Sequence, residues 1–229
     1  APQVRFLVTS QRTLNVVGEW VFTVRPLDYP PDDAADAASD DYSAVQFFCE
    51  SALRRQPDFA LTSDNWPHVA RICRLLGGIP LALELAAGWL HARSCQEIAH
   101  EIQNDLDFLR TSSPGVPERH RSIRAAFDYS WALLTAEEQT VLRRLAVFPA
   151  GFSREAALYV AAATEAALDA LVDKSMLQRV TYESPHPITR YGMHYLIRRY
   201  AMERLVSNPD DAFFAHQQHC EYYCALLAR

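Results

Sequence analysis

Three side chains near the C-terminal end have the types and spacing of metal ligands. His216, Cys220 and Cys224 follow one another at intervals of four residues, and imidazole and thiolate are ligands that Zn²⁺ prefers. On one helical face, however, ligands at positions i, i+4 and i+8 span about 12 Å, which is too far for a single tetrahedral ion. We therefore expect these residues to belong to a core stripe, and we predict no metal site.

Two other groups of polar residues could do chemistry. Residues 28–42 are rich in Asp and could attract a cation, but their Pro and Ala content is more typical of an exposed connection. Combinations of Ser, His and Asp occur, yet none lies in a nucleophile elbow or a comparable context. We predict no catalytic residue.

The chain contains no loop that could cradle a phosphate group. The pattern G-x-x-x-x-G-K-[ST] is absent, and no Gly-Lys dipeptide occurs among the seven glycines. Without that loop, no ring of backbone N–H groups binds phosphates and no hydroxyl holds Mg²⁺. We expect that this chain by itself is not an enzyme and does not hydrolyse ATP.

Composition places the chain among ordinary globular proteins. It has 229 residues, of which 49% are hydrophobic and 22% charged, and its net charge is −6. This charge argues against a nucleic-acid coat or a polybasic membrane module. No run of 18 apolar residues and no signal peptide is present, so we expect a cytoplasmic protein without a membrane partner. An odd number of cysteines predicts reduced, buried thiols, at Cys49, Cys73, Cys95, Cys220 and Cys224.

The elements that must position any site are mostly helices. The exception is the apolar run 4–9, which predicts a strand covered on both faces. A single strand cannot satisfy its own backbone groups, so we expect its partners in sequence outside this chain, which would then be a fragment.

Apolar residues at helical spacing then predict a bundle. A helix ends at Gly77-Gly78, which suits a left-handed C-cap, and Pro80 starts the next helix, where proline is favoured. Residues 81–91 are apolar almost all round and should lie at the centre of the bundle. A further helix is predicted from Ile98 to Leu109, and residues 112–117 form the clearest domain boundary.

The spacing after this boundary resembles a winged helix. A helix is predicted over 122–134, and a capping box at 135–138 opens a second one that carries Val141, Leu142 and Leu145. Further helices are predicted after the caps Ser153 and Thr164, and finally over 195–205. Two β-prone segments around the turn at 184–187 predict a hairpin wing. A last helix carries an apolar stripe that we expect to face the core: Phe213, His216, Cys220, Tyr223, Cys224 and Leu227. The predicted fold class is mainly α, a helical bundle followed by a winged-helix domain, with one residual strand at the N-terminus.

Four groups of residues form motifs that follow one another along the chain. Residues 9–14 (T-S-Q-R-T-L) are followed by Gly18-Glu19 and Pro26-Leu27, residues 78–87 read G-I-P-L-A-L-E-L-A-A, and further segments lie at 119–130, 145–152, 171–175 and 190–201. In this order they resemble the NB-ARC class of STAND ATPases, in the branch of bacterial multidomain regulators. The first group looks like a sensor strand and its exit, and the second resembles the GxP motif. The next three segments look like that branch's winged helix, and 190–201 lies where the MHD motif is expected.

The resemblance implies an organisation and a mechanism. Residues 1–30 would be the end of an α/β nucleotide-binding domain, 43–113 a helical ARC-like bundle, 117–207 the winged helix, and 208–229 the start of a C-terminal helical region. In the intact protein, ADP or ATP with Mg²⁺ would be clamped between these domains as a regulatory switch. No nucleotide is expected to bind this fragment tightly. The implied partners are the absent nucleotide-binding domain, C-terminal sensor repeats, and protein partners or further copies on activation.

The same resemblance assigns nucleotide contacts to Gly78, Pro80 and His194, and a γ-phosphate sensor to Gln11 or Arg12. Tyr195 stands where the family has an aspartate, which weakens the expected lock on ADP. The simpler alternative is that Gly78-Ile79-Pro80 is only a joint between helices and that His194 only fills a strand-to-helix corner.

Two further functions stay open. One is a DNA-binding transcription regulator, although the helix that would enter the major groove carries Glu165, Asp169 and Asp173 against a single Lys174. Direct DNA binding by this helix is therefore not expected. The other is a helical scaffold for protein partners. Basic residues gather elsewhere, where they could face phosphate, dock a domain or lie in solvent: Arg119, Arg121, Arg124, Arg190, Arg198 and Arg199.

Overall fold

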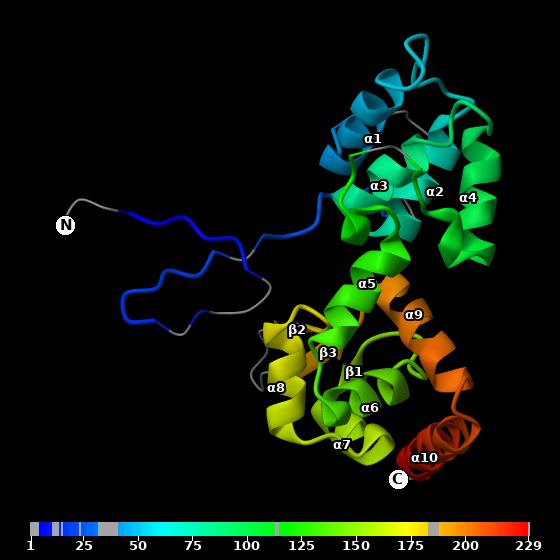
Figure 1. Cartoon of the computed structure of the whole chain (residues 1–229). Coiled ribbons are helices and arrows are strands. Elements are labelled where there is room, and N and C mark those ends of the chain that lie inside the picture. The colour runs from blue at the N-terminus through cyan, green and yellow to red at the C-terminus, as the bar shows by residue number, and fades with distance from the viewer. Residues whose placement is uncertain are drawn as a thin grey trace. The chain divides into compact units, whose positions relative to one another are not determined.

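The computed structural model describes residues 5–10, 14, 16–22, 24–31, 41–112, 115–182 and 188–228. These residues form mainly helices with one small sheet, which confirms the predicted fold class (Figure 1). The chain divides into two compact units. One, the helical unit, comprises residues 25–135 and 195–203. The other, the winged-helix unit, comprises residues 1–24, 136–194 and 204–229.

The helical unit packs short helices around one apolar core. Its helices are α1 (Ser43–Leu53), α2 (Trp66–Leu76), α3 (Pro80–Ala87), α4 (Cys95–Asn104) and α5 (Ile123–Ala132), with the 3₁₀ turns η1 (Leu106–Phe108) and η2 (Glu118–His120) and most of α9 (Tyr195–Val206). The predicted central helix α3 buries five of its eight residues, as expected for a largely apolar helix in the bundle. The predicted helix from Ile98 to Leu109 is shorter, because Asp105 is extended and caps η1 with its carboxylate.

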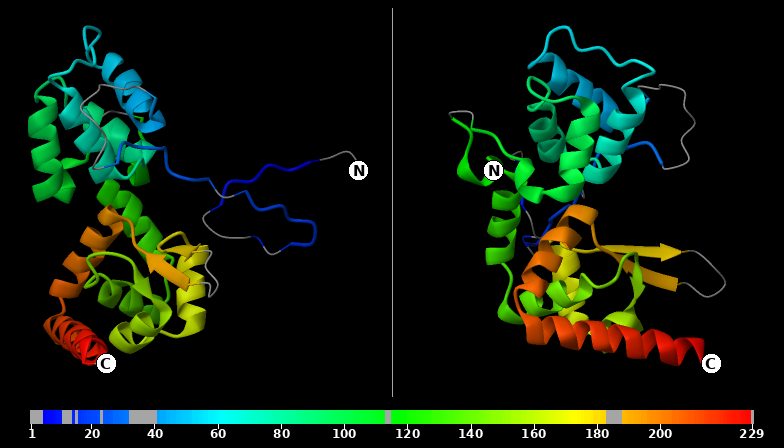
Figure 2. Two further views of the ribbon diagram at one scale, coloured as in Figure 1. Left: turned by 180° about the vertical axis from the view of Figure 1, so that it is seen from behind. Right: turned by 90° about the vertical axis from the view of Figure 1, so that its right-hand side faces the viewer.

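The winged-helix unit consists of three helices, a three-stranded sheet and a final long helix. Its helices are α6 (Ala136–Leu145), α7 (Arg154–Ala161), α8 (Glu165–Asp173) and α10 (Pro209–Leu227). The strands β1 (Phe152–Ser153), β2 (Gln178–Tyr182) and β3 (Ile188–Gly192) are antiparallel in the order β1-β3-β2, and Phe152 and Arg179 both lie opposite Tyr191. The predicted hairpin wing is therefore confirmed as β2 and β3 (Figure 2).

Local capping signals set the starts of α7 and α8. The Ser153 hydroxyl accepts a hydrogen bond from the Ala156 N–H at 3.1 Å, and the Thr164 hydroxyl accepts one from the Ala167 N–H at 3.1 Å. Both residues were predicted as caps, since a hydroxyl at this position satisfies an N–H group that the helix leaves unpaired. The same device, from Ser122 to the Ala125 N–H, begins α5 in the helical unit.

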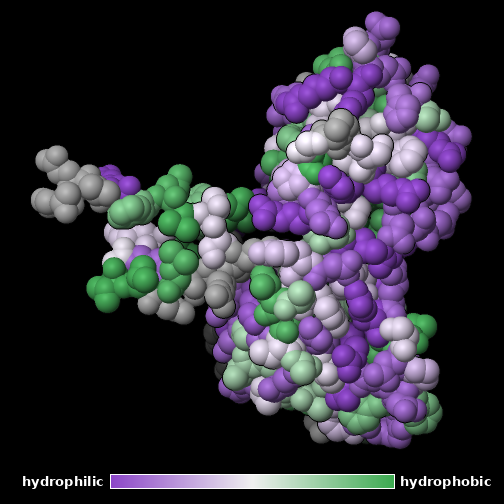
Figure 3. Space-filling model, in the orientation of Figure 1, coloured by the Kyte–Doolittle hydropathy of each residue, from purple (hydrophilic) through white to green (hydrophobic). Residues whose placement is uncertain are grey.

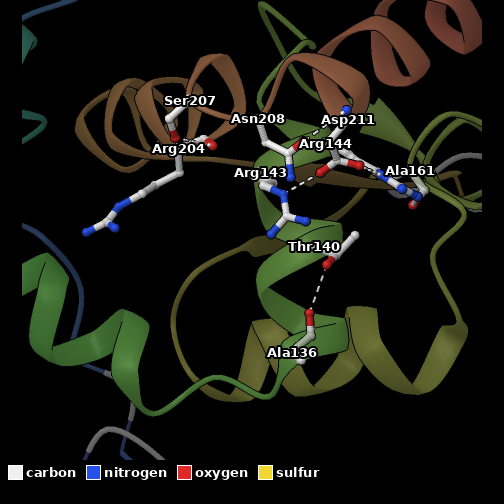
Figure 4. A network of polar contacts seen from close by, with 9 residues as sticks. All are labelled: Ala136, Thr140, Arg143, Arg144, Ala161, Arg204, Ser207, Asn208 and Asp211. Carbon is white, nitrogen blue, oxygen red and sulfur yellow. Dashed lines mark hydrogen bonds and ion pairs between the residues drawn. The ribbon is translucent and has the colours of Figure 1, made fainter.

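A cluster of buried charges attaches α10 to the rest of its unit. Asp211 lies in the first turn of α10 and is 8% exposed. It accepts hydrogen bonds from Arg143 and, at 2.6 Å, from Arg144, which both lie at the end of α6 (Figure 4). Arg144 also donates to the Ala161 carbonyl of α7 and covers the ring of Phe214. The cluster thus joins the start of α10 to the ends of α6 and α7.

The face that α10 buries differs from the predicted one. Asp211 and Ala215 are buried, and Tyr222 packs against Tyr159 of α7 with ring centroids 5.6 Å apart. The side predicted to face the core is mostly exposed, with Phe213 at 73% and Leu227 at 86%. Of the predicted stripe, Tyr223 is partly buried, and its ring centroid lies 6.4 Å from that of Phe148. Cys220 and Cys224 are exposed as well, so the expectation of buried thiols is wrong for this pair. It holds for Cys73 and Cys95, which are buried, whereas Cys49 is partly exposed.

The predicted N-terminal strand is not formed in the described residues 5–10. Phe6 and Leu7 are 88% and 99% exposed, and further along the chain Trp20 and Phe22 are similarly exposed. Hydrophobic residues therefore gather on the surface of this N-terminal part of the chain (Figure 3). A strand exists only through ladder hydrogen bonds to a neighbouring strand, and no strand of the described residues forms such a ladder with this segment. The sequence has the composition of a buried strand without the pairing that would make it one.

No helix within the described residues combines the length and the apolar character that crossing a membrane requires.

We expect Asp211→Ala to lower the free energy of unfolding of the winged-helix unit by about 3 kcal/mol, because it leaves two partly buried arginines without their shared carboxylate. The matched control is Asp210→Ala, an exposed carboxylate in the same helical turn, which should cost less than about 1 kcal/mol. Chemical denaturation followed by far-UV circular dichroism, with hydrogen exchange measured on peptides from 209–227, tests this. Equal losses for the two variants would contradict a structural role for the cluster.

Candidate functional site

The segment 78–80 forms a tight joint between α2 and α3. Gly77 and Gly78 have φ angles of +54° and +68°, which end α2, and Pro80 occupies the first position of α3, where no N–H partner is needed. The predicted C-cap and helix start are therefore confirmed.

Gly78 also makes room for a distant part of the chain. The Leu27 N–H donates a hydrogen bond to the Gly78 carbonyl at 2.9 Å, and a Cβ atom on Gly78 would lie 1.9 Å from the Leu27 carbonyl oxygen. Further hydrogen bonds fix the same segment: Asp28 N–H to the Ser43 hydroxyl at 2.9 Å, and Arg74 to the Pro31 carbonyl at 3.2 Å. Glycine is required here both by its backbone conformation and by this close approach.

The other predicted site residues lie in different places. Pro80 is exposed beside this joint, within the helical unit. His194 belongs to the winged-helix unit, between the end of β3 and the start of α9; its side chain is partly buried, with the Nε2 atom inside. Gln11 and Arg12, the candidate sensors, lie outside the described residues. Gly78 therefore has a defined structural role, because it allows Leu27 to approach closely. The nucleotide contacts stay predictions.

The most distinctive surface of the winged-helix unit is the outward face of α8. Glu165, Asp169 and Asp173 recur every four residues and are exposed, so they form one acidic stripe along the helix. Two of them are paired at the surface, Glu165 with Arg154 at 3.2 Å and Asp169 with Arg179 at 3.1 Å. The two arginines come from α7 and β2, the elements that flank α8.

The single lysine of this region faces the interior. Lys174, the C-cap residue of α8, binds both carboxylate oxygens of Glu138 in α6 at 2.6 and 2.8 Å. Glu138 is 7% exposed, so the pair is largely removed from water. The sequence showed that the helix was poor in cations, but not that its only cation is used inside the domain.

Several arginines that were candidates for phosphate contacts have acceptors within their own units. Arg124 binds Asp107 and, at 2.8 Å, Glu203. Desolvation lowers the pKa of Arg124, but the hydrogen bonds and charges of these two carboxylates together outweigh it and raise the pKa. Arg199 donates to the Ile102 carbonyl, and Arg190 to the Gly151 carbonyl. Within the described residues, no group of three or more His, Cys, Asp or Glu side chains could hold a metal ion.

We expect Gly78→Ala to destabilise the helical unit by about 3 kcal/mol or more, since it adds backbone strain and forces Leu27 away from its hydrogen bond. Gly115→Ala is the matched control: its φ is +85°, but nothing lies within 4 Å of the added Cβ, so only the strain of about 1 kcal/mol remains. The buried Trp66 and the partly buried Trp89 report on this unit, so denaturation followed by tryptophan fluorescence measures the difference. Similar losses in both variants would mean that the approach of Leu27 does not matter.

Comparison with known proteins identifies a winged helix-turn-helix domain over residues 134–206, which cover α6 to α9. Over 234 aligned residues, the chain is 34% identical to proteins of Mycobacterium bovis and Mycobacterium tuberculosis whose names give them as inferred HTH-type transcriptional regulators. That alignment covers 99% of this chain but 25% of each relative, so the chain spans about a quarter of their length. It is also 31% identical over 212 residues to an uncharacterised protein of Mycobacterium bovis, covering 89% of this chain and 50% of that relative.

Proposed function

We propose that this chain is a regulatory segment of a transcription regulator, and that its winged helix contacts protein rather than the major groove of DNA. The names of the relatives support the class of protein. The observation that carries the second part is the charge of α8, whose exposed stripe is acidic and whose only lysine is bound to Glu138.

The physical argument rests on the charge of DNA. Duplex DNA carries one negative charge for about every 1.7 Å of its axis, so affinity comes largely from lysine and arginine contacts to phosphates. Readers of the major groove place Arg, Lys, Asn or Gln on the helix that enters it. The helix α8 presents Glu165, Asp169 and Asp173 instead. These carboxylates would repel the phosphates. They could accept few hydrogen bonds from the bases to compensate for this repulsion.

The finer proposal is that the segment acts as a nucleotide-dependent switch of the STAND type, in a protein that supplies a phosphate-binding loop. The four sequence motifs support it, and so does the joint at 78–80, where the Leu27 backbone is held against Gly78. A joint of this kind would transmit a movement of the preceding segment directly to α3. ADP or ATP with Mg²⁺ would be the ligand, with Pro80 and His194 as contacts.

The second candidate is direct DNA binding through the winged helix. The family match and the names of the relatives favour it, because winged helix-turn-helix domains occur in DNA-binding regulators. In that case the wing or another edge of the unit would have to supply the contacts that α8 does not.

A charge-reversal experiment separates these candidates. We expect the wild-type chain to show no binding to mixed-sequence duplex DNA in fluorescence anisotropy at about 150 mM salt. The triple variant Glu165→Lys, Asp169→Lys, Asp173→Lys should gain salt-sensitive binding, because its cations lie on the helix that the fold presents. The control variant Asp58→Lys, Asp64→Lys, Glu118→Lys makes the same change in net charge at exposed positions of the helical unit. Binding by the wild type, or equal gains in both variants, would count against the proposal.

The nucleotide switch has its own test. We expect no saturable ADP binding and no ATP hydrolysis by the 229-residue chain, measured by calorimetry and phosphate release. In a longer protein with a phosphate-binding loop, His194→Ala should weaken ADP binding about 10- to 100-fold, the loss of one charge-assisted hydrogen bond. His216→Ala, at an exposed histidine of α10, is the control. Unchanged ADP affinity in the His194 variant would mean that His194 only fills the corner between β3 and α9 and does not contact ADP.

A further inference from the structure

Two cysteines on the outer face of α10 form an isolated dithiol. Cys220 and Cys224 are both exposed, and their Sγ atoms lie 4.0 Å apart on successive turns of the helix. The other three cysteines belong to the helical unit and are buried or partly buried there. The structure therefore presents one accessible pair of sulfur atoms, held at a fixed spacing by helical backbone.

The spacing suits a bridging atom better than a disulfide. A disulfide requires Cβ atoms about 3.5–4.5 Å apart, whereas residues four apart on a helix hold them at about 5–6 Å. Direct oxidation would have to distort the helix. An atom that forms bonds of about 2.3 Å to sulfur reaches two sulfur atoms up to roughly 4.6 Å apart, which includes the observed 4.0 Å.

The number of sulfur ligands at this site decides which kind of sulfur-binding atom fits it. A structural Zn²⁺ ion takes four ligands, and the described residues contain no group of three or more candidate ligands. A trivalent arsenic atom that already carries one organic group needs only two sulfur atoms. We propose that Cys220 and Cys224 form a binding site for mono-organic trivalent arsenic compounds.

The reaction needs no oxidant or reductant. An arsenic(III) oxide, R–As=O, forms two As–S bonds with the two thiols while its bond to oxygen breaks, and both thiol protons leave with that oxygen as water. The hydrogen bond with Cys224 raises the pKa of the Cys220 thiol, so this proton has to leave as the As–S bond forms. Leu227 follows Cys224 by three residues and is 86% exposed, so an apolar neighbour for the organic group lies on the same side of the helix.

The test uses phenylarsine oxide at one equivalent per chain, followed by desalting in excess 2-mercaptoethanol and intact-mass measurement. Wild type should retain one phenylarsenic group, because two linked thiols hold it more tightly than separate monothiols do. Cys220→Ser and Cys224→Ser should each lower the apparent affinity at least about 100-fold, since either change leaves a monodentate site. Inorganic arsenite, which takes a third sulfur ligand, should be retained less well than phenylarsine oxide.

Cys49→Ser is the matched control and should retain the group like wild type. Far-UV circular dichroism establishes that each variant is folded, as expected for conservative changes at exposed positions and at the partly exposed Cys49. Retention in either the Cys220 or the Cys224 variant, loss in the Cys49 variant, or release from wild type under the same challenge would each overturn the assignment.

Discussion

Buried carboxylates and the cations that they require organise the winged-helix unit. Glu138 and Asp211 are the charged residues that the described part of the chain buries most completely, at 7% and 8% exposure. A carboxylate removed from water is tolerated only when cations and hydrogen bonds compensate it. Glu138 therefore holds Lys174, and Asp211 holds the arginine pair of α6. The first pair joins α6 to the end of α8, and the second joins α6 and α7 to the start of α10. Because the buried Glu138 needs a cation, Lys174 points away from the surface of α8. The burial of one carboxylate thus leaves that surface without its lysine.

Features set by neighbouring residues could be predicted from the sequence. Ser153 and Thr164 begin their helices because a hydroxyl at that position satisfies an N–H group a few residues away. Gly77, Gly78 and Pro80 mark the joint because their backbone preferences are local. The close approach of Leu27 to Gly78 is different, since the two residues are far apart in sequence and no periodicity connects them. The sequence therefore predicted that glycine would occur at a turn, but not that the backbone of a distant segment would lie against it.

The rotation of α10 shows where hydrophobic periodicity is insufficient. The helix carries apolar residues on more than one side, so the sequence offers two possible buried faces. Asp211 decides between them: Cys220 follows it by nine residues, which is half a turn away on a helix of 3.6 residues per turn. Once Asp211 faces the arginine pair, the stripe of Phe213, Cys220 and Leu227 must face outward. The sequence did contain a signal for this arrangement: an acidic residue in the first turn of α10 and two adjacent arginines at the end of α6. It is an interaction over about seventy residues, which a local pattern does not contain. The exposed N-terminal run has a related cause, because its composition is typical of a strand while no strand of the described residues pairs with it.

A winged helix specifies how a helix is presented, and the side chains on that helix determine what it can contact. In this chain the presentation is intact, with the caps, the antiparallel sheet and the hairpin wing all in place. The surface of α8 lacks the cations that phosphate contacts need, and the arginines nearest to it, Arg154 and Arg179, are bound to its own carboxylates. The names of the relatives, which are about four times as long as this chain, describe those proteins as wholes, and they assign DNA contact to no particular quarter of them. The family match and the acidic stripe are therefore compatible: the winged-helix fold is present, and the exposed face of α8 is acidic.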